Sequence, residues 1–166
     1  MNTGASWLVE AAAHLGQREV PGPGWSPWIK SWWLALKGGA WWVKTYPDDS
    51  ILPWCGAFVA GCLARVGLPY AAQYASARAW MTWGVACGPL RGAVCVLSRN
   101  GGGHVGFLAA RSADGSFVQL LGGNQGDAVT HAWFPVERVL GYRKPAGWVL
   151  DLTPVRAVGT KSQSEA

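Results

Sequence analysis

The stretch PWCGAFVAGCL, from Pro53 to Leu63, joins a polar loop to an apolar run and has a cysteine at the junction. Proline favours the start of a helix, because it has no backbone N–H to leave unpaired there. The apolar residues that follow recur at helical spacing, so we expect a helix over residues 54–66. Cys55 then lies in the first turn of this helix.

A thiol at a helix start has a chemical advantage over the other cysteines of the chain. Unpaired N–H groups and the helix dipole stabilise negative charge there, so the pKa of Cys55 should fall and its thiolate fraction should rise. Cysteine is otherwise among the most buried residue types, and Cys62, Cys87 and Cys95 fit a core role. We therefore take Cys55 as the candidate nucleophile.

The rest of the chain predicts helices first and strands second. Helices are expected over 5–16, 28–39 and 76–84, the last with Ser76 as N-cap, and residues 40–53 read as irregular. Short β-branched and aromatic runs predict strands over 92–97, 104–110, 117–122, 128–134 and 140–144, with a hairpin turn at Asp114-Gly115. This order indicates an α+β fold, with N-terminal helices packed on an antiparallel sheet of about five strands. We expect one domain over 1–150 and a polar tail over 151–166.

A thiolate nucleophile needs a base, and the base needs a third group to orient it. Of the three histidines, His14 falls in the first helix and His131 inside a strand pattern. His104 follows three glycines and opens a strand, which allows close approach of backbone or substrate. The next strand ends in GGNQGD, and antiparallel pairing should bring Asn124 next to His104.

The order PWCGAFV, GGGHVGF, LLGGNQGD and LGYRKP, preceded by EVPGPG, resembles the CHAP and NlpC-type cysteine amidases and peptidases. The resemblance covers about residues 5–145 and implies a papain-like α+β fold that cleaves amide bonds in peptidoglycan. By motif it implies Cys55 as nucleophile, His104 as general base and acid, and Asn124 as the group that orients the imidazole. The chain departs from the family at Gly92-Ala93, where members often have Gly-Asp.

Further residues around these motifs are candidates for binding. The tryptophan-rich segment 25–42 could line a glycan or peptide groove, or could supply core contacts. Tyr46 is also a candidate second oxyanion donor. Asp48 and Asp49 could bind calcium, which needs six to eight oxygens, or could form a solvated turn. The substrate-binding candidates are Trp25, Trp41, Trp42, Tyr46, Trp54, Gly103 and Gln125.

The composition limits which classes of binding partner are expected. The net charge is +5 over 166 residues, with basic residues scattered along the chain, so a nucleic-acid stripe is not expected, whereas an anionic cell wall suits the charge. No apolar run is long enough to predict membrane insertion. The N-terminus lacks the pattern of a secretory signal, so we expect synthesis in the bacterial cytoplasm and action on the wall after release through a pore or delivery by a virion or secretion apparatus. No cofactor is expected.

Taken together, these features predict a peptidoglycan hydrolase, as a phage lysin, acting as a monomer or as a component of a virion or secretion apparatus. Cleavage of a stem-peptide or cross-bridge bond and cleavage of the N-acetylmuramoyl-L-alanine bond both remain open. Two alternatives stand beside it. The first is a non-catalytic virion structural or cell-wall-binding module that keeps the fold, and the second is a cysteine hydrolase acting on a cytoplasmic protein or small amide.

Overall fold

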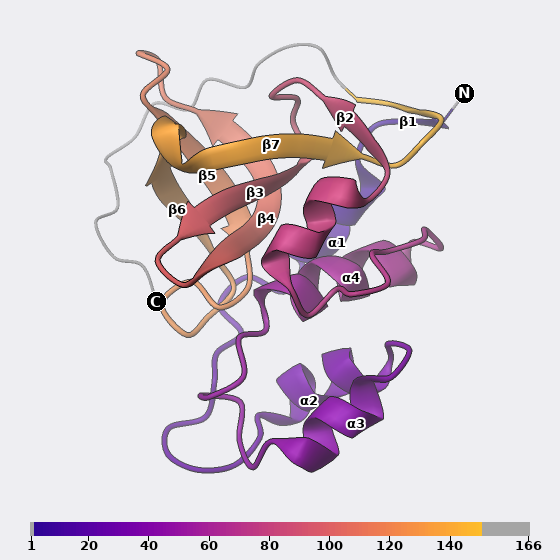
Figure 1. Ribbon diagram of the computed structural model, residues 1–166, viewed down its shortest axis with the longest axis vertical. Helices are drawn as coiled ribbons and strands as arrows, with labels where there is room; N and C mark the ends of the chain where they lie inside the picture. The colour runs from indigo at the N-terminus through magenta and orange to yellow at the C-terminus, as the bar shows by residue number, and fades with distance from the viewer. Residues whose placement is uncertain (1, 151–166) are drawn as a thin grey trace.

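The chain forms helices first and an antiparallel sheet second in the computed structural model, which describes residues 2–150 (Figure 1). The predicted tail over 151–166 lies outside the described residues. The helices are α1 (Ser6–Ala12), α2 (Pro27–Leu34), α3 (Gly39–Thr45) and α4 (Cys55–Arg65), followed by the 3₁₀ helix η1 (Ala77–Thr82). Among these residues, no helix has the length and apolar character needed to cross a bilayer.

The main sheet has six antiparallel strands in the order β2-β7-β3-β4-β5-β6. The α+β class is therefore confirmed, with one strand more than the five expected, because the short β2 was not predicted. A separate parallel pair joins β1 and β8 near the two ends of the described chain. The strands are β1 (Asn2–Thr3), β2 (Val85–Cys87), β3 (Val94–Arg99), β4 (Gly102–Arg111), β5 (Phe117–Gly122), β6 (Thr130–Pro135), β7 (Val139–Lys144) and β8 (Trp148–Val149), with the 3₁₀ turn η2 (Val136–Arg138) before β7.

Three helical predictions differ from the structure. The helix expected over 5–16 spans only Ser6–Ala12. The helix expected over 28–39 ends at Leu34, and α3 occupies part of the segment expected to be irregular. Gly38 adopts a left-handed φ of 77°, which lets the chain turn and start a new helix. Trp42 then packs on Trp33 with ring centroids 5.6 Å apart. The segment over 76–84 forms the 3₁₀ helix η1, and the Ser76 side chain makes no capping hydrogen bond.

Helix α4 is the central element of the core. Every residue from Cys55 to Leu63 is buried, because α1 and α2 pack against the helix on one side and β4 on the other. Figure 1 shows α4 between the sheet and the pair formed by α2 and α3. Ten of the twelve tryptophans belong to this core. Six are buried in it, Trp7, Trp32, Trp33, Trp54, Trp80 and Trp83, and four pack against it, Trp25, Trp28, Trp42 and Trp148.

A glycine inside α4 allows α2 to approach. A Cβ built on Gly61 would lie 2.1 Å from a ring carbon of Trp32, far inside van der Waals contact. Trp32 has little freedom to move away, because the Arg65 guanidinium covers its ring at 4.0 Å and His14 packs edge-on at 4.7 Å. The glycine is therefore needed for packing, although it weakens the helix as such.

We predict that Gly61→Ala destabilises the protein by about 1–3 kcal/mol, the usual cost of overpacking a core. Helix propensity alone would predict the opposite sign, a gain of about 1 kcal/mol. Gly88→Ala is the matched control, because a Cβ there meets no atom within 4 Å. Urea unfolding of both variants measures the difference. A Gly61→Ala variant as stable as the wild-type protein would contradict the packing argument.

Candidate active site

Cys55 is the first residue of α4, as predicted, and only 4% of its surface is exposed. Its sulfur faces the backbone N–H groups of Val105, on β4, and of Gly56. A Cβ on Gly56 would lie 1.9 Å from the carbonyl oxygen of Tyr74, so this glycine lets the chain around Tyr74 pass directly beside the thiol. The start of α4 is thus enclosed by β4 and by the segment before η1.

The thiol is neutral in this environment. Burial raises the pKa of Cys55, and the N–H groups of Val105 and Gly56, together with the positive charge of Arg99, offset that effect only in part. The expectation that the helix start alone would lower the pKa is therefore wrong in sign. The free-energy cost of desolvating the thiolate is larger than the stabilisation that the nearby N–H groups provide. A nucleophilic role for this thiol would therefore require a base to remove its proton.

His104 lies in β4, opposite Leu97 of β3, one residue before the Val105 N–H that faces Cys55. Its side chain is also only 4% exposed, and its ring packs against Phe134 with centroids 5.3 Å apart. Its Nε2 atom is 2.9 Å from Oε1 of Gln125. No hydrogen bond joins the imidazole to the Cys55 sulfur among the interactions of residues 2–150.

The hydrogen bonds of Gln125 determine which imidazole nitrogen carries the proton. The Gln125 amide nitrogen donates to the carbonyl oxygens of Thr130, at 2.7 Å, and Leu120, at 3.3 Å. Carbonyl oxygens only accept, so the amide oxygen must be the atom that faces His104. It too can only accept, so Nε2 of His104 carries the hydrogen. The Nδ1 atom then has a free lone pair and can act as a base.

The charge state of His104 follows from its surroundings. Burial lowers its pKa to about 4, the Gln125 hydrogen bond opposes this, and the charges of Arg99 and Arg138 add to it. Gln125 supplies an acceptor without a negative charge, so it orients the ring but does little to favour imidazolium. The resting site therefore combines a neutral thiol with a neutral imidazole.

The predicted partner of the imidazole was wrong by one residue. Gln125, expected only to bind substrate, holds His104, and Asn124 makes no hydrogen bond to it. The strand β5 ends at Gly122, so its pairing does not extend to residue 124. Asn124 takes a left-handed φ of 58°, which turns the chain and directs the next side chain to the ring. The other two histidines lie elsewhere, His14 on Glu10 and His131 exposed on β6.

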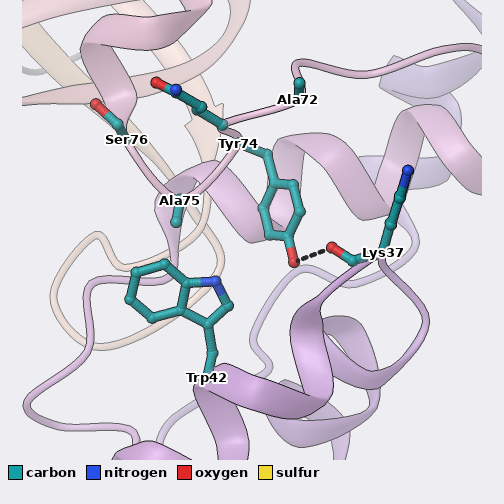
Figure 2. A pocket seen from close by; sticks show the side chains of 7 residues that line it. Lys37, Trp42, Ala72, Tyr74, Ala75 and Ser76 are labelled. Atoms are coloured by element: carbon teal, nitrogen blue, oxygen red, sulfur yellow. Dashed lines mark hydrogen bonds between the residues drawn. The ribbon is translucent and has the colours of Figure 1, made fainter.

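A cavity of about 430 Å³ adjoins the Tyr74 segment that passes Cys55 (Figure 2). Trp42 and Lys37 form its wall on the side of α3, and Gln73 and Ser76 line the opposite wall. Figure 2 shows the Trp42 ring turned toward Ala75, with the Tyr74 hydroxyl donating a hydrogen bond to the carbonyl oxygen of Lys37 at 3.1 Å. Of the predicted binding residues, Trp42 lines this cavity.

The other aromatic candidates divide between surface and core. Trp41 is 59% exposed and meets Trp42 edge-on, and Tyr46 stacks on Trp42 with centroids 5.7 Å apart. Trp25 donates from its indole nitrogen to the carbonyl oxygen of Tyr46 at 3.1 Å. Trp54 is buried and donates to Glu19 at 2.7 Å, so its role is structural. The Tyr46 hydroxyl has no hydrogen bond within the described residues, so nothing links it to the site as an oxyanion donor.

The remaining candidates have structural partners. Gly103 lies against Ala77 and Arg78, which a Cβ would approach within 3.4 Å, beside His104. Asp48 accepts hydrogen bonds from the N–H and hydroxyl of Ser50, and Asp49 accepts one from the Ser26 N–H at 2.7 Å. Over residues 2–150, no three His, Cys, Asp or Glu side chains are grouped to hold a metal ion. Asp48 therefore closes a local turn with Ser50, whereas Asp49 is buried and joins its loop to Ser26, so the solvated turn expected for the pair does not describe Asp49.

Comparison of the chain with models of protein families, with curated proteins and with solved structures gave no match in any of the three. The site therefore has to be interpreted from its own geometry and chemistry.

We predict that His104 stays neutral to well below pH 6 and titrates near pH 4, with its proton on Nε2. The unfolded chain binds a proton at about pH 6.5, so stability is complete above that pH and falls as the pH drops toward 4, by at most about 3 kcal/mol. ¹⁵N NMR of the imidazole measures both tautomer and pKa. His104→Ala should flatten the stability profile in this window. A titration near pH 6.5, or an Nδ1–H tautomer, would contradict the account.

Proposed function

We propose that the protein is a cysteine hydrolase that cleaves an amide bond in peptidoglycan, with a papain-like arrangement of α4 against the sheet. The observation that carries the proposal is the enclosed set Cys55, His104 and Gln125. The thiol lies at a helix start, the base is one residue from the backbone N–H facing that thiol, and a fixed amide leaves Nδ1 of the base unprotonated. A merely structural cysteine needs none of these neighbours.

The chemistry starts from the neutral pair. His104 Nδ1 takes the thiol proton as the Cys55 sulfur attacks the amide carbonyl carbon, and the carbonyl electron pair moves to oxygen. The imidazolium then gives this proton to the leaving amine as the C–N bond breaks, which leaves a thioester on Cys55. Nδ1 next removes a proton from water, the resulting hydroxide attacks the thioester, and the proton returns to the sulfur as the acid leaves. Catalytic hydrogen bonds often form only when substrate binds, which is consistent with the lack of a hydrogen bond between the Cys55 sulfur and the His104 imidazole in the free protein.

The first turn of α4 also supplies the oxyanion donor. The first backbone hydrogen bond of this helix runs from the Phe58 N–H to the Trp54 carbonyl oxygen, at 2.9 Å. The N–H of Cys55 therefore has no partner within the helix. Such an N–H can donate to the negative oxygen that develops during attack. The cavity walled by Trp42 is also lined by Tyr74, whose carbonyl oxygen lies against Gly56 of the same turn. An indole face beside polar groups suits a sugar ring or a peptide.

A second reading is a non-catalytic wall-binding or virion module that keeps the fold. The low exposure and neutral state of Cys55 and His104 favour it, because an inert buried pair has the same properties. The exposed Trp41 and the cavity beside Trp42 would then provide binding without cleavage.

We predict that Cys55→Ala abolishes the release of soluble fragments from purified sacculi, whereas Cys87→Ala, which removes a half-buried thiol from β2, retains it. Mass spectrometry of the fragments identifies the bond cut. Sedimentation of Cys55→Ala with sacculi separates the two readings, since a hydrolase variant binds without cutting. Equal lysis by Cys55→Ala and the wild-type protein would end the hydrolase reading, and binding without lysis by every form would favour the second.

We predict that Gln125→Ala lowers turnover by an intermediate factor, because it frees the imidazole to rotate but leaves it in place. General acid–base assistance is worth roughly 10²–10⁴-fold in total, so the loss should fall within that range. Asn124→Gly is the control: glycine tolerates the left-handed φ at this position, and the imidazole is hydrogen-bonded to Gln125 rather than to Asn124. Comparable losses in the two variants would contradict the assignment of Gln125.

A further inference from the structure

A second cavity, of about 420 Å³, lies between helix α1 and the strands β4, β5 and β6. Residues of α1 line it together with Ala109, Leu121 and His131, one from each of the three strands. Small-molecule sites have volumes of about 300–1,000 Å³, so this cavity lies near the lower end of that range. None of the three residues of the candidate active site lines it, which makes it a separate site.

Short side chains leave this space open at the edge of the sheet. Leu121 of β5 pairs with His131 of β6, so both side chains lie on the same face of the sheet. Helix α1 packs against α4 and β5, and β6 lies beyond β5 as the edge strand. Ala12, the last residue of α1, and Ala109, at the bulge of β4, are too short to fill the gap between the helix and the strands.

The apolar part of the lining is aliphatic. It carries neither an aromatic ring nor a polar side chain, and its larger residues are Leu8, Val9 and Leu121. Val9 is 75% exposed, so part of this apolar surface faces water in the free protein. A peptide lying here would leave its N–H and C=O groups against aliphatic walls without partners, which is costly. An unbranched alkyl chain has no such groups, and its burial is favourable.

The two polar side chains of the lining are both basic. Arg91, in the loop before β3, and His131, on the edge strand, are exposed. Within residues 2–150, no ion pair joins either of them to a carboxylate. A guanidinium presents a fork of N–H donors that matches a carboxylate, and an imidazole donates from a ring nitrogen. The lining thus combines aliphatic walls with donors for one small anionic group.

We propose that this cavity binds a medium-chain fatty acid, with its alkyl chain between α1 and Leu121 and its carboxylate at Arg91 and His131. The site goes beyond the proposed hydrolase function and does not depend on it. A diacyl lipid of a membrane fits less well, because a cavity near the lower end of the small-molecule range has room for one short chain. A segment of a second protein chain meets the same objection as a peptide.

The first measurement follows the binding of sodium octanoate to wild-type protein by ¹H–¹⁵N NMR, below the concentration at which octanoate forms micelles. We expect saturable shifts of the Val9 amide, the Arg91 side chain and the His131 imidazole. Each buried methylene contributes about fourfold in affinity, so hexanoate should bind about 15-fold more weakly than octanoate. Acetate has the charge without the chain and octanol has the chain without the charge, so both should bind more weakly than octanoate.

The second measurement repeats the octanoate titration on variants. Ala12→Phe should abolish the shifts, because this exposed position lines the cavity and a phenyl ring there would occupy it. Ala13→Phe is the matched control and should retain them, since Ala13 is also exposed but does not line the cavity. Arg91→Gln should weaken binding by about fivefold, the upper end for an exposed ion pair, whereas Lys30→Gln on α2 should not change it. The spectrum of each variant also shows whether it is folded, and the arginine variant tests the site if Ala12→Phe is not.

The outcomes separate the possible occupants. Saturable octanoate binding with the expected dependence on chain length, Ala12 and Arg91 would support the fatty-acid site. Equal affinities for acetate and octanoate, or for octanol and octanoate, would overturn it. Absence of octanoate shifts together with binding to phosphatidylglycerol vesicles that Ala12→Phe abolishes would overturn it in favour of a membrane surface. Concentration-dependent dimerisation that Ala12→Phe abolishes, again without octanoate shifts, would overturn it in favour of a second copy of the chain.

Discussion

The rest of the site depends on the close approach of the first turn of α4 to β4. The Cys55 sulfur faces the Val105 N–H, so the helix start and the strand that carries His104 are in direct contact. Two glycines make this approach feasible. Gly56 admits the carbonyl oxygen of Tyr74, and Gly123, where a Cβ would lie 2.3 Å from the Trp54 ring, admits the loop that carries Gln125. A side chain at either position would push one wall of the site away from the thiol.

This enclosure has an electrostatic consequence. The N–H groups at a helix start stabilise a thiolate, but the same packing that brings them to Cys55 also removes water, and burial is the larger effect on its pKa. Burial likewise keeps His104 neutral. Cys55 and His104 are therefore both neutral in the free protein and do not form an ion pair. The hydrogen bond from His104 to Gln125 instead fixes the tautomer of the imidazole, and the Gln125 amide is itself held by Thr130 and Leu120.

The sequence predicted the elements that have strong local signals. The Pro-Trp-Cys junction located the start of α4 to within a residue, and the glycines before His104 located a strand, although that strand begins two residues earlier than expected. It did not predict α3, because Gly38-Gly39 reads as a helix end and the packing of Trp42 on Trp33 is a tertiary contact. The choice between Asn124 and Gln125 also depended on tertiary structure. Strand register pointed to Asn124, and only the left-handed turn after β5 brings Gln125 to the ring. The pKa of Cys55 was missed for the same reason, since sequence shows a helix start but not the depth at which it is buried.

The most direct test of the account is to trap the covalent intermediate. Wild-type protein mixed with soluble stem-peptide fragments and quenched in acid within the first turnover should carry an acyl group on one cysteine, because thioesters survive at low pH. Peptide mapping by mass spectrometry then locates it. We expect a mass increase equal to the acyl part of the cleaved substrate on the peptide that contains Cys55, and none on Cys62, Cys87 or Cys95. Hydrolysis of the fragments without an adduct on Cys55, or with the adduct on another residue, would contradict the proposed mechanism.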